Sequence, residues 1–219
     1  MAITICKGAQ PITIINPHRC QPAQQAALTD LLISAVQSTY RHVPGFVAAA
    51  IHVSEDGRRV TNYAQYESAE AARGVRNHPN VPAIAAAVNE LAAGFDFHLY
   101  EVTATVTAAT SPVVIAATTE LVTLVDVYHC EPAQQPALAE LLERALEAAH
   151  RPEPGFISGS LHRSQDGGRV AVYAQWQSRA AVEAAQNSAA LTALAPQIKA
   201  LTTGFDGLHH YTVASAVAA

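Results

Sequence analysis

The sequence predicts an α+β protein made of two copies of one domain, and three observations carry this prediction. First, long segments recur: "CQPAQQAALTDLL" from Cys20 matches "CEPAQQPALAELL" from Cys130, and "AAGFD" from Ala92 matches "TTGFD" from Thr202. Second, the offset between the copies stays constant from Cys20 to Asp96, and roughly two aligned positions in five are identical. Third, each copy spans about 100 residues, which is the size of a domain and far longer than a solenoid repeat.

Each copy begins with a strand and a helix. "ITIIN" at 12–16 and "LVTLVDVY" at 121–128 are short and β-branched, which is typical of strands. After Pro132, apolar residues recur three and four positions apart and so share one face of a helix. They are Leu138, Leu141, Leu142, Ala145 and Leu146. A proline near the first turn suits a helix start, and "PEPG" at 152–155 predicts its end.

A hairpin, a helical region and a last strand complete each copy. "FISGSLHRS" and "RVAVYAQWQS" flank "QDGG", and Asp-Gly is a strong hairpin signal. Ser178 is the expected N-cap of a second helix through "RAAVEAAQN", and a further helical stretch is expected from about Leu191 to Leu201. "HHYTVAS" then forms the fourth strand. The order β-α-β-β-α-β is the split-βαβ, or ferredoxin-like, arrangement.

Such a unit carries its helices on one face of an antiparallel sheet, so the other face must be buried against a partner. The fused second copy supplies that partner. We therefore predict two tandem ferredoxin-like (βαββαβ) domains, 11–106 and 120–219, that form a dimeric α+β barrel within one chain. Residues 107–119 lack helix caps and strand alternation, which indicates a crossing linker. A further homodimer of the whole chain is compatible with this fold but is not required.

The composition excludes several classes of protein. Half of the chain is hydrophobic and 14% is charged, which is ample material for packed cores. The net charge is −5 and the basic residues are scattered, so nucleic acid is not an expected partner. Three cysteines without CxxC spacing indicate a reducing compartment and argue against a disulfide framework or a structural zinc. No segment has the pattern of a signal peptide or a membrane span, so we expect a soluble, cytoplasmic protein without a membrane partner.

Several motifs resemble one known family. "INPHRCQPAQQAALTDLL", "PGFVAAAIHVSEDGRRVTNYAQYES" and their second copies look like the antibiotic biosynthesis monooxygenase family. The hairpin "LHRSQDGGRVAVYAQWQS" is the strongest part, because its turn, strand and terminal Trp come in the family's order. The family contains small dimeric α+β barrel enzymes, including cofactor-independent anthrone oxygenases. The resemblance implies a monooxygenase of antibiotic biosynthesis that oxidises a polycyclic aromatic polyketide with O2 as co-substrate and no metal or flavin.

The resemblance also implies site residues. In such enzymes an Asn on the first strand and an Asn four residues before a Trp bind and polarise the aromatic substrate, and positions four apart share a strand face. The first copy matches with Asn16 and Asn62 but has Tyr66 where the Trp is expected. The second copy has Trp176, with Asp126 and Val172 at the two Asn positions. Neither copy holds the full set, and the implied catalytic residues are Asn16, Asn62, Tyr66, Trp176 and Asp126.

Each of these residues also has a structural interpretation. Tyr66 and Trp176 either line a pocket or are core aromatics. For Asn62 the pocket interpretation is favoured, since Asn is disfavoured within strands and a buried amide needs hydrogen-bond partners. Asn16 precedes a proline and either belongs to the pocket or ends its strand. Asp126 is either a base whose pKa burial would raise or a solvated strand residue.

Two histidines recur at equivalent positions one strand away, His52 and His162. They either bind the substrate and accept a proton from its phenol, or they are hydrogen-bonded structural groups. Tyr63 and Tyr173 recur on the strand face opposite Asn62, where we expect them to fill the interface between the sheets.

Three other functions are open. A cyclase, lyase or isomerase of the same kind of pathway would use Asp126 or a His as general base without consuming O2. A binding protein would keep the fold without catalysis. A haem-degrading enzyme would use His78 in "RNHPN" as an iron ligand, although a solvated histidine at a helix end explains the same residue.

Overall fold

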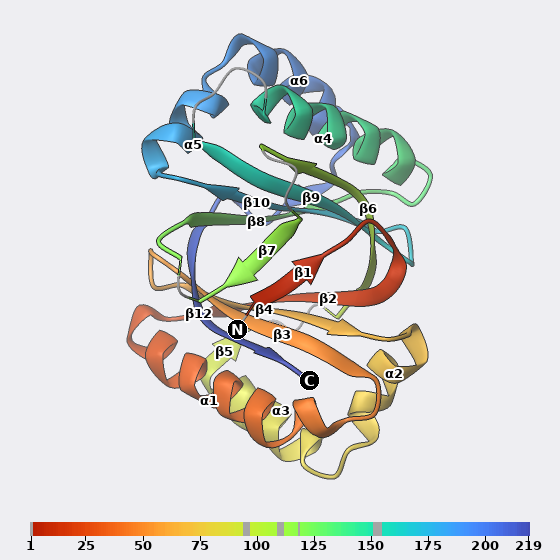
Figure 1. Ribbon diagram of the computed structural model, residues 1–219, viewed down its shortest axis with the longest axis vertical. Helices are drawn as coiled ribbons and strands as arrows, with labels where there is room; N and C mark the ends of the chain where they lie inside the picture. Colours follow the sequence, from red (N-terminus) through yellow and green to blue (C-terminus); the bar gives the residue numbers. More distant parts are fainter. Residues whose placement is uncertain (1, 94–96, 109–111, 118, 151–154) are drawn as a thin grey trace.

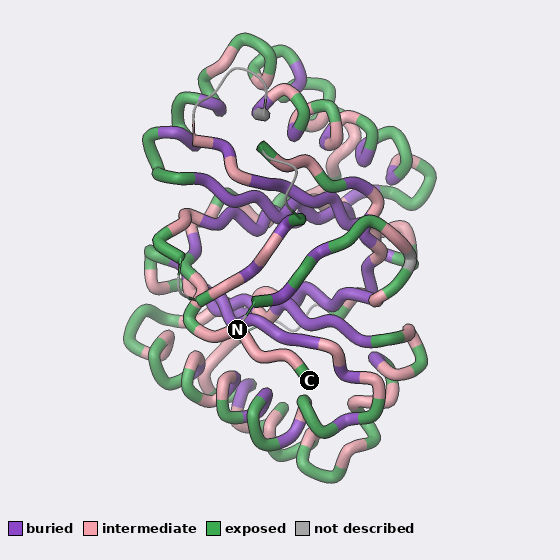
Figure 2. The backbone as a smooth tube through the Cα atoms, in the orientation of Figure 1, coloured by how far each residue is buried: buried purple, intermediate pink, exposed green. Residues whose placement is uncertain are grey.

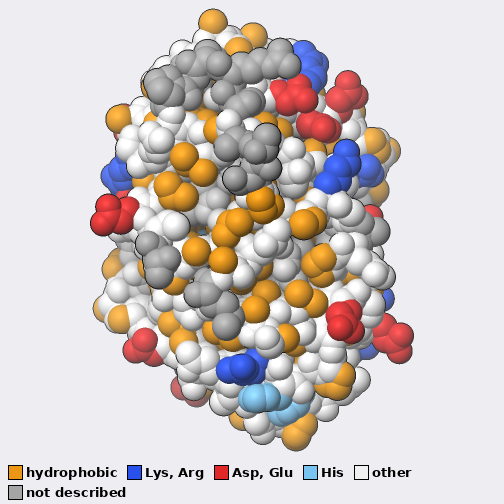
Figure 3. Space-filling model, viewed as in Figure 1, with side chains coloured by type: hydrophobic (Ala, Val, Ile, Leu, Met, Phe, Trp, Pro, Cys, Tyr) orange, Lys and Arg blue, Asp and Glu red, His pale blue; other side chains and the backbone are white. Residues whose placement is uncertain are grey.

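The computed structural model describes residues 2–93, 97–108, 112–117, 119–150 and 155–219. Most of the helix stop predicted at "PEPG" therefore lies outside the described residues. No helix in these ranges is both long and apolar enough to cross a membrane. On the face that Figure 3 shows, acidic and basic side chains are scattered between apolar atoms and form no basic stripe.

The predicted order of elements is confirmed in both units. The first unit contains β2 (Gly8–Cys20), α1 (Gln25–Ser38), β3 (Phe46–Ser54), β4 (Arg59–Tyr66), α2 (Ala69–Gly74), α3 (Val81–Leu91) and β6 (Leu99–Thr107). The second contains β8 (Val122–His129), α4 (Gln135–His150), β9 (Phe156–Ser164), β10 (Arg169–Trp176), α5 (Arg179–Gln186), α6 (Ala189–Leu201) and β12 (His210–Ala218). Short strands β5 (Ala92–Ala93) and β11 (Gly204–Phe205) precede the last strand of each unit. As predicted, Ser178 caps α5, its hydroxyl accepting the backbone N–H of Ala181 at 3.2 Å.

The two sheets close into one antiparallel barrel. The strand order is β10-β9-β6-β2-β4-β3-β12-β8, and β8 pairs back to β10. The last strand of each unit joins the two sheets, because β6 pairs with β9 and β12 pairs with β3. Helices α1 to α3 cover the outer face of one sheet and α4 to α6 that of the other (Figure 1). The chain thus forms the predicted dimeric α+β barrel by itself.

The predicted linker contains a short strand that its lack of alternation did not indicate. β7 (Val113–Ala116) pairs antiparallel with β1 (Ala2–Ile5), and this ribbon lies between the two sheets (Figure 1). Val113 and Ile115 are 1% and 0% exposed and pack in the barrel core, whereas Val114 and Ala116 are half-buried. Four residues are too few for a clear alternation, and the partner strand lies at the other end of the first unit, so the sequence pattern did not reveal it.

The buried residues form three cores. One core lies between sheet and helices in each unit, and the third fills the barrel between the two sheets. Figure 2 shows that the buried segments run along the barrel strands, while the helices are buried on one side only. Each strand therefore has a barrel-facing side and a helix-facing side, and side chains alternate between them.

Many of the repeated residues hold the hairpins in place. Gln25 donates from Nε2 to the backbone oxygens of Ser54 and Arg59 at 2.7 and 3.0 Å. Gln135 makes the same bonds in the second unit, to the equivalent serine and arginine, at 2.8 and 2.9 Å. Gly57 in the turn has a φ of +75°, a conformation that favours glycine. The recurrence of "PAQQ" and of the Ser-x-Asp-Gly turn is thus explained by structure.

Candidate functional site

Asn16 and Asn62 lie side by side on the helix-facing side of the first unit. Their Cα atoms are partners in the β2–β4 ladder. Their strand neighbours Ile14, Val60 and Ala64 pack in the core under α1, which fixes the direction of the two amides. β2 continues through Pro17 to Cys20, so Asn16 does not end its strand.

Pro17 fits this strand because one edge of β2 has no ladder partner there among the described residues. The pairing with β6 extends only to Ile14, and that with β5 begins at Arg19. A proline lacks the N–H that a ladder needs, so it is tolerated at such a gap. Asn16 and His18 flank this proline and both point to the helix-facing side.

Three polar atoms on this face have no hydrogen-bond partner within the described part of the chain. They are Oδ1 of Asn16, Oδ1 of Asn62 and Nδ1 of His18, all buried. Asn62 is half-buried, whereas every other residue of β4 is buried, so solvent-accessible space reaches the middle of the strand at this point. Our sequence analysis did not select His18. The period-two alternation that places it beside Asn16 was the available signal.

Aromatic side chains lie further along the same strand face. Tyr66 is 3% exposed and contacts Phe46 edge to face, with ring centroids 5.8 Å apart. Burial, with a further contribution from Tyr40, raises the pKa of Tyr66 far above its usual value, so its phenol stays protonated. Burial lowers the pKa of His18 to about 4, so its imidazole is neutral at neutral pH. The face offers neutral hydrogen-bonding groups, with an aromatic pair further along the same strands.

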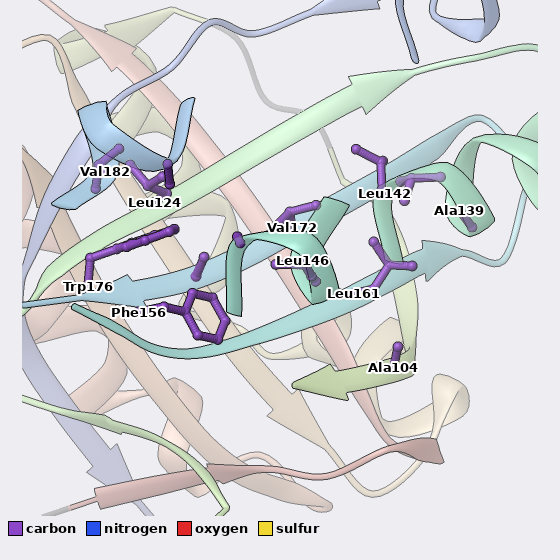
Figure 4. Packing of buried hydrophobic residues seen from close by; sticks show 14 of the residues in the cluster. Ala104, Leu124, Ala139, Leu142, Leu146, Phe156, Leu161, Val172, Trp176 and Val182 are labelled. Carbon is purple, nitrogen blue, oxygen red and sulfur yellow. The ribbon is translucent and has the colours of Figure 1, made fainter. Parts of the chain in front are cut away.

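The equivalent face of the second unit is more apolar. Asp126 is the ladder partner of Val172, which is 8% exposed and part of the core under α4. Trp176 contacts Phe156 edge to face at 5.1 Å. Figure 4 shows these two rings side by side, with Leu142 and Val172 among the neighbouring apolar side chains.

Asp126 is the exception in this apolar environment. Its side chain is almost fully buried, and its Oδ1 has no partner in the described ranges; the same holds for Nε1 of Trp176. Burial raises the pKa of Asp126 to about 8, so the carboxyl is mostly protonated at neutral pH. Tyr128 occupies the position equivalent to His18 and stacks on Phe205, with centroids 4.6 Å apart.

His52 and His162 lie on the barrel-facing side and are not brought together with Asn62 or Trp176. His52 Nε2 is 3.1 Å from the Tyr173 hydroxyl, and His162 Nε2 is 3.1 Å from the Tyr63 hydroxyl. Each pair joins the two units, and the tyrosine rings contact each other at 5.6 Å. Tyr63 and Tyr173 thus fill the interface between the sheets, as expected, and the histidines have the geometry of hydrogen-bonded structural groups.

His78 lies in a turn after a 3-10 helix (Val75–Asn77), where its Nδ1 accepts the backbone N–H of Asn80 at 3.2 Å. Among the residues that the structure describes, no group of three His, Cys, Asp or Glu side chains is arranged to hold a metal ion. Two surface hollows of about 400 Å³ lie elsewhere, between α4 and α6 and beside α2.

Comparison with known proteins agrees with this architecture. The family model described as antibiotic biosynthesis monooxygenase matches residues 11–87 and 121–214. Tetracenomycin-F1 monooxygenase of Streptomyces glaucescens is 36% identical over 78 residues, which cover 36% of this chain and 70% of that protein.

Two solved structures share the fold over nearly the whole chain. An anthrone oxidase-like protein aligns with a TM-score of 0.86 and 19% identity, covering 100% of this chain and 96% of that one. A protein of Fusobacterium nucleatum aligns with a TM-score of 0.65 and 11% identity, covering 94% of each chain. The family model covers both units, which confirms the predicted family: the chain belongs to the antibiotic biosynthesis monooxygenase family, with two of the family's domains in tandem.

Proposed function

We propose that this protein is a monooxygenase that oxidises a polycyclic aromatic polyketide intermediate of antibiotic biosynthesis with O2 and without a bound cofactor. The observation that carries the proposal is the pair of amides, Asn16 and Asn62, side by side on a face that solvent reaches. Their buried oxygens have no hydrogen-bond partner among the residues that the structure describes. The name of the Streptomyces relative, tetracenomycin-F1 monooxygenase, supports the substrate class.

The reaction needs no group that the substrate and O2 do not supply. An electron-rich anthrone loses a methylene proton, and its carbanion reduces O2 and forms a C–O bond, giving a hydroperoxide. Loss of the second methylene proton with cleavage of the O–O bond releases water and leaves a carbonyl. The balance is CH2 plus O2 to C=O plus H2O. The protein has to bind the flat substrate, stabilise the enolate oxygen and limit water.

The first unit has the groups for these tasks. An amide accepts the O–H of a phenol through its oxygen, and donates to the enolate oxygen through its NH2 once the proton has left. Tyr66, buried edge to face against Phe46, lies on the same strand face as Asn62 and would contact one edge of the ring system. The second unit has Val172 in place of one amide and a protonated carboxyl in place of the other, so we assign the oxygenation to the first unit.

The test is O2 uptake with dithranol, an electron-rich anthrone, measured on a matched pair of variants. Asn62→Ala should lower kcat by about 100- to 1,000-fold, the usual loss for one oxyanion donor. Val172→Ala, at the equivalent position, should retain the kcat of the unmodified protein. Equal effects of the two substitutions would contradict the assignment to the first unit. Tyr66→Ala and Trp176→Ala extend the comparison. Full turnover in both variants would show that neither aromatic side chain is needed for the reaction.

A second candidate is a non-redox isomerase or cyclase, and the buried carboxyl of Asp126 favours it. A carboxyl that is protonated at neutral pH can donate a proton to a substrate carbonyl. This reaction would proceed without O2 and would be lost in Asp126→Asn. Conversion of a polyketide ketone under anaerobic conditions would therefore distinguish it from the oxygenase.

A further inference from the structure

We propose that His18 is the general base that removes the substrate proton in the first unit. The inference rests on the proposed function and adds to it the group that starts the reaction. Nothing in the family motif singles out this histidine. Its place in the strand, its surroundings and the residue at the equivalent position of the second unit all support this role.

His18 lies within reach of the same ligand as the two amides. Residues two apart on one strand face are about 6 to 7 Å apart, and directly opposed side chains about 5 Å. Asn16 therefore stands between His18 along β2 and Asn62 across the ladder. In an anthrone, the carbonyl oxygen and the acidic methylene are on opposite sides of one six-membered ring. A ligand whose oxygen is held by the amides thus presents its methylene at the distance of a neighbouring side chain.

The imidazole is neutral, and its Nδ1 is not engaged by any described group. The His18 side chain is 3% exposed, and its Nδ1 has no partner among the described residues. The titratable groups that share this face are Tyr66, Tyr40 and Cys20, and burial raises the pKa of all three, so they remain neutral. Helices α1 and α3 each carry one acidic side chain, Asp30 and Glu90, and both are exposed to solvent. Among the residues that the structure describes, the buried carboxyl is Asp126 of the second unit, and none lies on this face.

The proton balance is closed within the site. His18 takes the methylene proton, and the C–H electron pair moves onto the ring and its oxygen, where the amides stabilise it. After the carbanion has reduced O2 and formed the C–O bond, the imidazolium returns the proton to the distal oxygen, giving the hydroperoxide. His18 then takes the second methylene proton as the O–O bond breaks and the C–H electron pair forms the C=O bond. That proton passes to the departing hydroxide, which leaves as water. His18 is neutral again at the end of the cycle.

The second unit has Tyr128 at the equivalent position. Burial raises the pKa of its phenol well above its usual value, with the neighbouring Asp126 contributing, so it cannot act as a base at neutral pH. One strand position thus distinguishes a unit that can deprotonate a substrate from one that cannot. The proposal predicts one active unit per chain.

The experiment separates proton transfer from oxidation. Exchange of the dithranol methylene protons with D2O is followed by NMR without O2, and O2 uptake is measured in parallel. His18→Gln should slow both by about 100-fold or more, the usual contribution of a general base. The matched control, Tyr128→Phe, should leave both rates unchanged. In the unmodified protein, kcat should fall on the acid side of the pH profile near pH 4, and this fall should be absent in His18→Gln. Added imidazole should restore part of the exchange rate of the variant.

The outcomes distinguish the two proposals. Exchange that depends on His18 supports the base even if O2 uptake fails, in which case only the oxygenase is wrong. O2 uptake and exchange that persist in a folded His18→Gln variant, with an unchanged pH profile, overturn the role of His18 and leave the oxygenase standing. Absence of both reactions in the unmodified protein overturns both. Unfolding of His18→Gln in urea, compared with Tyr128→Phe, identifies a loss that is due to misfolding.

Discussion

Replacing Asp126 by Asn should stabilise the protein at neutral and alkaline pH. The carboxyl is 5% exposed in an apolar core, and burial raises its pKa from 3.8 to about 8. The folded protein therefore holds a proton that the unfolded chain releases. With this sign, the stability that Asp126 contributes is complete below pH 3.8 and is lost as the pH rises towards 8.

The magnitude follows from the proton linkage. Each pH unit between the unfolded and folded pKa values corresponds to about 1.4 kcal/mol, so the loss at neutral pH is about 4 kcal/mol. An Asn side chain does not titrate, but its amide is also buried without a partner, which costs about 1 to 3 kcal/mol at every pH. Asp126→Asn should therefore be less stable than the unmodified protein in mild acid and more stable above neutral pH.

Urea unfolding across this pH range measures the effect. The single Trp of the chain, Trp176, is buried in the same core, so its fluorescence reports unfolding directly. The informative quantity is the difference in unfolding free energy between variant and unmodified protein, because the contributions of the other titrating groups are the same in both and cancel. Asp30→Asn, at an exposed carboxylate of α1, is the matched control for the removal of a carboxylate. A difference in unfolding free energy for Asp126→Asn that does not change with pH would refute the reasoning.

Three further predictions use the same unfolding assay. Tyr173→Phe leaves Nε2 of His52 without its partner and should cost about 1 to 3 kcal/mol; the double variant with His52→Phe should cost less than the sum, and strict additivity would argue against the pair. Ile115→Ala, which empties a fully buried position of the β1–β7 ribbon, should cost about 2 to 5 kcal/mol, and no loss would mean that the ribbon is not part of the core. Burial lowers the pKa of His18, His52 and His162 to about 4. As the pH drops from 6.5 towards 4, these histidines take up protons in the unfolded chain before they do so in the folded protein, so stability should fall. A urea midpoint that stays constant over this pH range would contradict the burial of three neutral histidines.

Most of the fold could be predicted from the sequence because its signals are local. The repeats, the Asp-Gly turn and the apolar spacing after Pro132 each act within a few residues. The pairing of the two sheets followed from the need to bury a second face. The strand β7 could not be predicted, since its burial depends on β1, which pairs with it from the far end of the first unit.

The candidate site was predicted in part for the same reason. Strand alternation places Asn62 and Tyr66 on one face, whatever lies around them. It could not show that Asn16 is the partner of Asn62 in the ladder, because register is a property of two strands together. His18 was missed because a lone histidine has no meaning until its neighbours are known.

The sequence by itself determined the duplication, the order of elements and the resemblance to the family, since these depend on residue identity and on spacing along the chain. Only the tertiary structure decided which polar groups are buried without partners and which histidines pair with tyrosines across the barrel. The physical reason is that burial and hydrogen bonding depend on segments that are distant in the sequence. The same strand pattern gives an accessible amide at Asn62 and a closed apolar position at Val172, and packing from the rest of the molecule makes that difference.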